Sequence, residues 1–347
     1  MTKNHILVIH HGALGDVVST FPALLRLKKI YGSIAIICQS SIGQLAQEFD
    51  IVDKWFPLEA AAFATLYSSH IDPMVKNILL SYRKIILFSR SRSLEKTLYS
   101  ISENEVYRIP PRPDLSQKIH VTQHIFSNLV RCRLLEESDK DTRMMFSLSM
   151  YSDRRNPQYD PLKIIIHPGS GSRKKCWPIS NFVKVASSID GSGKQPEFIL
   201  GPAEYDLYEI LLQSKRLNAK VHKIETLTEL TGLLKTGGGF IGNDSGVSHL
   251  AAFIGLPTVT VFGPSDPKTW KPVGRAVKVV RPDLECSPCF EKGKVGCEEI
   301  ECVNRITPED VLAAFYGLIR LDSIYIKSMP IGRVNPDADL LGNHIHL

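Results

Sequence analysis

An aspartate follows two glycines in the stretch HHGALGDVVSTFPAL, residues 10–24. An apolar run precedes this loop and a helical pattern follows it. Gly12 and Gly15 would let another molecule approach the backbone closely, because glycine has no Cβ. Asp16 then has two possible roles. It could satisfy the orphan N–H groups of a helix as an N-cap, or its carboxylate could act as a catalytic base on a molecule lying over the loop.

A second loop combines small residues with positive charge. The stretch HPGSGSRKKCWP, residues 167–178, follows the apolar run KIIIH. Ser170 and Gly171 bring accessible backbone N–H groups, and a basic run ending at Lys175 comes directly before an expected helix start near Pro178. These features are typical of a phosphate-binding loop. The alternative is a surface turn with solvated charges.

A third loop lies in FIGNDSGVSHLAAFIG, residues 240–255. A helix is expected to begin near Ser245 or Gly246, and its unpaired N–H groups with about half a positive charge form an anion site. His249, one turn into the helix, can point at the same place. The alternatives are helix capping for Asp244 and Ser245, and an ordinary core or surface role for His249.

The surrounding elements place all three loops after expected strands. The strands are expected at 5–10, 33–39, 84–90, 163–167, 196–201, 239–242 and 257–263. The helices are expected at 16–32, 116–137, 179–189, 204–215, 227–237, 245–255 and 307–320. Buried strands that alternate with helices indicate parallel, doubly wound sheets. Ligands of such sheets bind beyond the carboxyl ends of the strands, so the three loops are the candidate site.

A polar segment divides the alternation into two halves. YSDRRNPQYDP, residues 151–161, carries two prolines and has no hydrophobic period, which is typical of a linker. The full length of 347 residues is sufficient for two domains. We therefore expect Rossmann-like α/β domains at 1–155 and 156–325 with a cleft between them, and a tail at 326–347.

Composition limits the functional class. Apolar residues make up 43% and charged residues 22%, as in a soluble globular protein, and the formal charge is +6. That excess is too small for a dedicated nucleic-acid binder, but it suits an anionic substrate. The sequence has no apolar run long enough to span a bilayer and no signal peptide pattern. We expect a cytoplasmic protein, or one that contacts the inner face of the cytoplasmic membrane.

The loop motifs together resemble glycosyltransferase family 9, the heptosyltransferases of bacterial lipopolysaccharide assembly. The motifs are ALGD, HPGSG with K-x-W-P, NDSGVSHLAA and TVTVFGPSDPKTWKP, in the family's order over about residues 5–320. The resemblance implies the GT-B fold, in which two Rossmann-like domains face a central cleft. The C-terminal domain would hold the sugar nucleotide and the N-terminal domain the acceptor.

The resemblance also implies a reaction. It is the inverting transfer of heptose from ADP-heptose to a lipopolysaccharide inner-core acceptor, without a metal or other cofactor. Asp16 matches the catalytic base, and Lys175 would pair with the diphosphate as it leaves. A DxD motif at Asp337 and Asp339 in the polar tail is not expected to hold a donor-bound metal.

Further site residues are expected from this match and from the residues themselves. The expected donor-binding residues are Ser170, Gly171, Lys175, Glu204, Asp244, Ser245, Gly246 and His249. The expected acceptor-binding residues are Gly12, Gly15, Arg90 and Arg92. Asp244 would accept hydrogen bonds from the donor sugar. Glu204 would lie near the ribose, or else be a solvated surface residue. Arg90 and Arg92 would meet an anionic acceptor, or else lie in a solvated basic loop.

Other interpretations stay open. The chain could be a transferase of the same fold that uses another nucleotide sugar, or a non-catalytic sugar-nucleotide binder, although a binder has no use for the base. A dehydrogenase is disfavoured because the first loop lacks GxGxxG. The expected partners are a nucleotide sugar and a lipid-linked oligosaccharide, with peripheral membrane contact and no nucleic acid.

Four cysteines near the C-terminus form a separate pattern. Cys286, Cys289, Cys297 and Cys302 have the spacing C-x2-C-x7-C-x4-C, which offers four zinc ligands. Reduced thiols or disulfides are the alternatives. The total of seven cysteines, an odd number, argues against a secreted disulfide scaffold.

Overall fold

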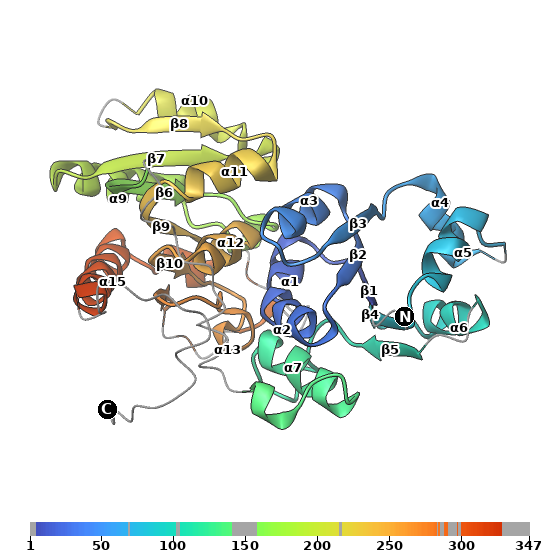
Figure 1. The fold of residues 1–347 in the computed structure, drawn as a ribbon. Helices are drawn as coiled ribbons and strands as arrows, with labels where there is room; N and C mark the ends of the chain where they lie inside the picture. Colours follow the sequence, from blue (N-terminus) through green and yellow to red (C-terminus); the bar gives the residue numbers. More distant parts are fainter. Residues whose placement is uncertain are drawn as a thin grey trace.

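Two parallel β-sheets, one from each half of the chain, lie next to each other in the computed structural model (Figure 1). The structure describes residues 5–68, 70–101, 105–140, 158–214, 217–282, 284, 288–290, 297 and 300–327. The predicted α/β class with two doubly wound units is confirmed.

The first sheet has five strands in the order β3-β2-β1-β4-β5, all parallel. Its strands are β1 (Ile6–His10), β2 (Ile34–Cys38), β3 (Lys54–Pro57), β4 (Lys84–Phe88) and β5 (Glu105–Ile109). The strand order reverses next to β1. A crevice at such a switch point is where ligands of open α/β sheets bind, so the loop after β1 lies where a site is expected.

Helices cover both faces of this sheet. They are α1 (Leu14–Val18), α2 (Phe21–Tyr31), α3 (Ser40–Glu48), α4 (Ala61–Ala64), α5 (Pro73–Leu80), α6 (Arg92–Ile101) and α7 (Val121–Arg131), with 3-10 turns η1 (Thr65–Tyr67) and η2 (Glu137–Lys140). Alternate strand residues enter different layers. Ile6 and Val8 join the cluster beneath α2, α3 and α7, whereas Leu7 and Ile9 join the cluster beneath α4 to α6. This explains why the strands are apolar without a break.

The second sheet has six parallel strands in the order β11-β10-β9-β6-β7-β8. Its strands are β6 (Asp160–His167), β7 (Gln195–Leu200), β8 (Lys220–Lys223), β9 (Gly237–Asn243), β10 (Thr258–Val261) and β11 (Val277–Val280). Its helices are α9 (Ile179–Gly191), α10 (Leu207–Leu212), α11 (Leu227–Leu234), α12 (Gly246–Ile254), α13 (Pro267–Trp270), α14 (Glu301–Asn304) and α15 (Pro308–Lys327), with 3-10 turns η3 (Arg173–Lys175) and η4 (Pro202–Glu204).

The predicted helix 16–32 is wrong in its extent. The structure has two helices, α1 and α2, separated at Ser19 and Thr20. The Ser19 hydroxyl donates to the Gly15 carbonyl at 2.7 Å, and Pro22 enters the first turn of α2, where its missing N–H costs nothing. Asp16 is therefore the third residue of a short helix, and the N-cap is Ala13.

Other predicted boundaries also shift. The helix expected at 116–137 is confined to α7, and the short strands β3, β5, β8 and β11 were not predicted. Of the expected linker 151–161, residues 151–157 lie outside the described residues, and β6 already begins at Asp160. Residues 328–347 of the expected tail also lie outside them. Within the described part of the chain, no helix combines the length and apolarity needed to cross a membrane.

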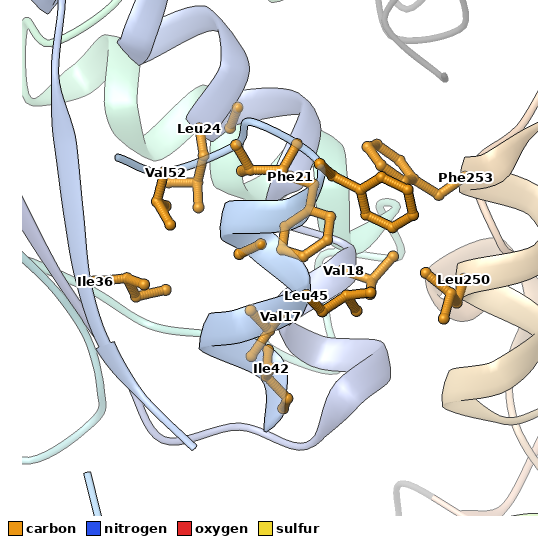
Figure 2. Packing of buried hydrophobic residues seen from close by; sticks show 14 of the residues in the cluster. Val17, Val18, Phe21, Leu24, Ile36, Ile42, Leu45, Val52, Leu250 and Phe253 are labelled. Carbon is orange, nitrogen blue, oxygen red and sulfur yellow. The ribbon is translucent and has the colours of Figure 1, made fainter. Parts of the chain in front are cut away.

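The two halves share one apolar cluster. Figure 2 shows Phe253 and Leu250 of α12 facing Val18 and Phe21 from the first half. The Phe253 ring lies edge-on to Phe21, with centroids 5.3 Å apart, and it also meets Phe49 at 6.0 Å. Burial of these rings holds α2 and the end of α3 against α12.

Glycine is required where α1 meets α12. A Cβ added to Gly246 would lie 2.9 Å from the Gly15 backbone nitrogen and 3.0 Å from the Leu14 Cβ. Gly246→Ala is therefore expected to lower the free energy of unfolding by about 1–3 kcal/mol through overpacking. Gly232→Ala, an exposed α11 position with open space around it, is expected to be neutral or stabilising. Denaturant unfolding of both variants checks the difference, and equal stabilities would contradict this account of the interface.

Candidate active site

The predicted loops converge at the junction of the two halves. Asp16 lies in α1 after β1, and Lys175 lies in η3 after β6. Asp244 follows β9 immediately before α12. The contact between α1 and α12 joins the first loop to the third, and a 2.8 Å ion pair between Lys175 and Asp244 joins the second to the third.

The Asp16 carboxylate is paired with an arginine rather than with a helix terminus. Its side chain is 13% exposed, and Oδ2 accepts a hydrogen bond from Nη2 of Arg112 at 2.9 Å. No side-chain hydrogen bond caps α1 at its N-cap, Ala13. The N-cap interpretation of Asp16 is therefore wrong. A carboxylate that is mostly buried but still partly open to solvent is suited to accept a proton from a bound hydroxyl group.

A buried histidine shapes the loop that carries Asp16. His10 ends β1, and its Nδ1 accepts the Gly12 N–H at 2.9 Å, so the ring proton is on Nε2. Burial lowers the pKa of His10 to about 4, although the nearby Asp16 carboxylate acts to raise it. The His10 ring is therefore neutral at pH 7. A Cβ on Gly12 would lie 2.5 Å from the His10 ring and 2.7 Å from the Asp16 Cβ. Only glycine fits there. The atoms that require it belong to His10 and Asp16, so the missing Cβ makes room for the chain's own side chains.

Lys175 lies between a carboxylate and an aromatic ring. Its Nζ is 2.8 Å from Oδ2 of Asp244 and 4.5 Å from the ring centroid of Phe290. Asp244 is only 5% exposed, so its buried negative charge needs the ion pair with Lys175. The Ser170 hydroxyl donates to the Asp244 carbonyl at 2.7 Å. Ser170 thus fixes the second loop against the third, and Gly171 has open space around it.

The buried amide of Asn243 fastens the same two loops. Its Nδ2 donates to the Pro168 carbonyl at 2.7 Å, and its Oδ1 accepts the Trp177 N–H at 3.0 Å. Trp177 is itself buried and donates from Nε1 to the Ile306 carbonyl at 3.0 Å. The K-x-W-P motif therefore places Lys175 through a tryptophan anchored in the core.

The N-terminus of α12 begins as predicted. Ser245 is the N-cap, and its hydroxyl accepts the Ser248 N–H at 3.3 Å. The N–H groups at the start of the helix carry a positive partial charge. His249 lies one turn in, with Nδ1 3.4 Å from the Ser19 hydroxyl. Burial lowers the pKa of His249 to about 4, so it can offer a ligand a hydrogen bond but not a charge at pH 7.

Glu204 is folded back onto its own turn. Its Oε2 accepts the Gly201 N–H at 2.9 Å and lies 3.8 Å from the buried His167. A Cβ on Gly169 would collide with the Glu204 carboxylate, so the second loop rests against this side chain. Its contact with a ribose stays a prediction.

The remaining predicted acceptor-binding residues are Gly15, Arg90 and Arg92. The close neighbour of Gly15 is the Gly246 backbone. Arg90 is 61% exposed, pairs with Asp114 at 3.6 Å and donates to the Arg112 carbonyl at 3.4 Å. Arg92 is the exposed first residue of α6. Their acceptor roles stay predictions.

Three residues of this region were not predicted. Arg112 carries no local signal, because it lies in an irregular segment 96 positions from Asp16. Trp270, whose ring is 5.3 Å from the Arg112 guanidinium, appeared in the motif GPSDPKTWKP without a role. Phe290 lies between the candidate zinc ligands Cys289 and Cys297, and no local sequence pattern marks it.

Cys286, one of the four candidate zinc ligands, lies outside the described residues. Asp337 and Asp339 of the DxD motif lie outside them as well. Among the residues with described positions, no group of three or more His, Cys, Asp or Glu side chains is placed to hold a metal ion. The Cys289 and Phe290 N–H groups both donate to the Pro264 carbonyl, at 2.9 and 3.0 Å. These bonds hold the Phe290 ring over Lys175.

Removing the Phe290 ring is expected to loosen Lys175. Phe290→Leu keeps an apolar side chain but deletes a cation–π contact of about 0.5–2 kcal/mol, so nucleotide affinity should fall about 2- to 30-fold. Phe290→Tyr should retain the affinity. Calorimetric titration with ADP checks both variants, and an unchanged dissociation constant for Phe290→Leu would show that the ring does not act through Lys175.

Known proteins are similar to this chain in sequence and in fold. The family model described as glycosyltransferase family 9 (heptosyltransferase) matches residues 105–297. The chain is 32% identical over 314 residues to lipooligosaccharide heptosyltransferase 2 of Campylobacter jejuni. The aligned region covers 86% of this chain and 94% of the relative.

Solved structures match along most of the chain. The ADP-heptose lps heptosyltransferase II of Escherichia coli has a TM-score of 0.67 at 18% identity, covering 92% of this chain and 99% of that one. The iron-containing dodecameric glycosyltransferase TibC of enterotoxigenic Escherichia coli has a TM-score of 0.57 at 16% identity, covering 91% and 76%. A second TibC structure is a complex with ADP-D-beta-D-heptose. These matches confirm the GT-B fold.

Proposed function

The chain belongs to glycosyltransferase family 9, and from that premise we propose that it transfers heptose from ADP-heptose to the inner core of a lipopolysaccharide or lipooligosaccharide, with inversion at the anomeric carbon. The observation that carries this proposal is the backbone contact between Gly15 and Gly246. It brings the Asp16 carboxylate beside the helix terminus best suited to a diphosphate. A lipid-linked acceptor implies peripheral contact with the inner face of the cytoplasmic membrane.

Asp16 is the general base in this proposal. Its Oδ2 is held by Arg112, which leaves Oδ1 to take the proton of an acceptor hydroxyl group. The hydroxyl oxygen forms a bond to the anomeric carbon of the heptose as the bond from that carbon to the ADP oxygen breaks. Attack comes from the face opposite ADP, so the configuration inverts. The products are the extended glycan and ADP.

Lys175 and the start of α12 stabilise the leaving diphosphate. The ammonium group of Lys175 and the N–H groups at Ser245 and Gly246 supply positive charge from the protein itself. When the diphosphate draws Lys175 away from Asp244, that carboxylate becomes available to hydroxyl groups of the donor sugar. The proposed chemistry needs no metal ion, although the relative TibC is described as containing iron.

Acceptor-dependent ADP release is the test of this function. The purified chain is expected to release ADP from ADP-heptose only when a truncated lipid A–core acceptor is present, and to keep its rate after chelation and removal of metal ions. If the rate is lost after chelation and returns when a metal ion is added, the proposed metal independence is wrong.

Two control outcomes separate the alternatives. Turnover of a different nucleotide sugar, without turnover of ADP-heptose, would mean that the same fold serves another donor. Tight ADP-heptose binding without turnover on any core acceptor would favour a non-catalytic binder and would remove Asp16 as a base. UDP-glucose and GDP-mannose serve as the comparison donors in parallel reactions.

A further inference from the structure

Arg112 links the carboxylate of Asp16 to the other half of the molecule. Its Nη2 donates to Oδ2 of Asp16 at 2.9 Å, while its guanidinium lies 5.3 Å from the ring centroid of Trp270. Asp16 belongs to the first half and Trp270 ends α13 in the second. One side chain therefore contacts both the proposed base and the nucleotide-binding half.

A second contact fixes the same pair of segments. Nε2 of His120 is 2.7 Å from the carbonyl of Lys271, the residue after Trp270. Nδ1 of His120 accepts the Thr122 N–H at 3.2 Å, so Nε2 carries the proton and donates. The segment between β5 and α7 is thus held against the end of α13 at two points.

The geometry leaves one oxygen of Asp16 for a substrate. Among the described residues, Oδ2 is engaged by Arg112 and no hydrogen bond or ion pair to Oδ1 is found. A carboxylate whose one oxygen is fixed presents its other oxygen in a defined direction, which is what a general base requires. Arg112 itself is 55% exposed, and an exposed ion pair alone fixes little. The Trp270 face supplies the second point of contact that restricts the guanidinium.

We propose that Arg112 is a positioning residue for Asp16 and that Trp270 acts through Arg112, so that the base is oriented only when the two halves are engaged. This inference rests on the proposed role of Asp16 as the base. It assigns a function to the tryptophan of the motif GPSDPKTWKP and to an arginine that sequence patterns did not identify.

The test is a double-mutant cycle in kcat. Arg112→Gln and Trp270→Leu are each expected to lower kcat at least about 10-fold, the scale of a lost contact that orients a reacting group, while KM for ADP-heptose changes less than about 2-fold. In the Arg112→Gln background, Trp270→Leu should change kcat by no more than about 2-fold, because its effect needs the guanidinium. Additive losses would show that Trp270 is merely structural and would overturn the coupling.

Conservative and remote variants complete the test. Trp270→Phe keeps an aromatic face and should recover most of kcat, whereas Arg112→Lys, which lacks the planar fork, should not. Phe56→Leu removes a comparable contact with Lys54 on the outer strand β3, and it should leave kcat unchanged. ADP titration and thermal unfolding verify that each variant is folded, and Arg112→Gln alters an exposed side chain, which keeps the test available if Trp270→Leu does not fold.

The outcomes separate this inference from the proposed function. If Asp16→Asn abolishes turnover but Arg112→Gln and Trp270→Leu leave kcat within about 2-fold, only the positioning role fails. If Asp16→Asn itself turns over normally, the base assignment fails and this inference fails with it. A rise in kcat for Arg112→Gln would show that the arginine masks the base instead of orienting it.

Discussion

Asp16→Asn is expected to lower kcat by about 10²–10⁴-fold, the usual contribution of a general base, with little change in nucleotide affinity. Asparagine has nearly the shape of aspartate, and its carbonyl oxygen can still accept the Arg112 hydrogen bond. The variant therefore loses basicity while keeping the local contacts of α1. Acceptor-dependent ADP release measures kcat, and calorimetric titration with ADP measures the affinity.

A second aspartate provides the matched control. Asp72 is the N-cap of α5, where its carboxylate accepts the Met74 N–H at 2.8 Å. Asparagine caps helices about as well as aspartate, so Asp72→Asn should preserve both stability and turnover. A kcat for Asp16→Asn within a few-fold of the unaltered chain would remove this carboxylate from the chemistry.

The local sequence was sufficient to predict the frame of the site. Unbroken apolar runs such as HILVIH predicted buried parallel strands, and glycine-containing loops after them predicted ligand-facing turns. The start of α12 at Gly246 followed from Ser245, a residue type that caps helices through its hydroxyl group. Each of these signals lies within a few residues of the feature that it predicts.

The contacts between distant segments could not be predicted in the same way. Arg112 follows β5, which β4 separates from β1 in the sheet, so its contact with Asp16 is made only in the folded chain. Lys175 and Asp244 were each predicted to meet the donor, but their ion pair with one another was not. The break between α1 and α2 depends on Ser19 bonding to the Gly15 carbonyl, a competition between side chain and backbone that the hydrophobic period does not contain.

Lys175→Gln is expected to lower kcat/KM by about 10²–10³-fold, as the loss of one donor to a developing anion does. Its ammonium group lies beside the start of α12 through its 2.8 Å contact with Asp244. Lys174→Gln is the matched control, because it removes the same charge from an exposed position one residue earlier in the same loop. That variant should retain nearly full activity in the ADP-release assay.

Two mechanisms could produce the loss in Lys175→Gln, and Asp244 distinguishes them. Lys175 could act on the diphosphate directly, or it could only neutralise a carboxylate that is 5% exposed and would otherwise repel the donor. In the second case the double variant Lys175→Gln, Asp244→Asn would recover activity, because no buried charge remains unpaired. If the lysine acts directly, the double variant should regain folding stability in denaturant unfolding while kcat/KM stays at least about 10²-fold low. Recovered activity would assign the diphosphate to the helix terminus alone, since the N–H groups of α12 are unchanged in both variants.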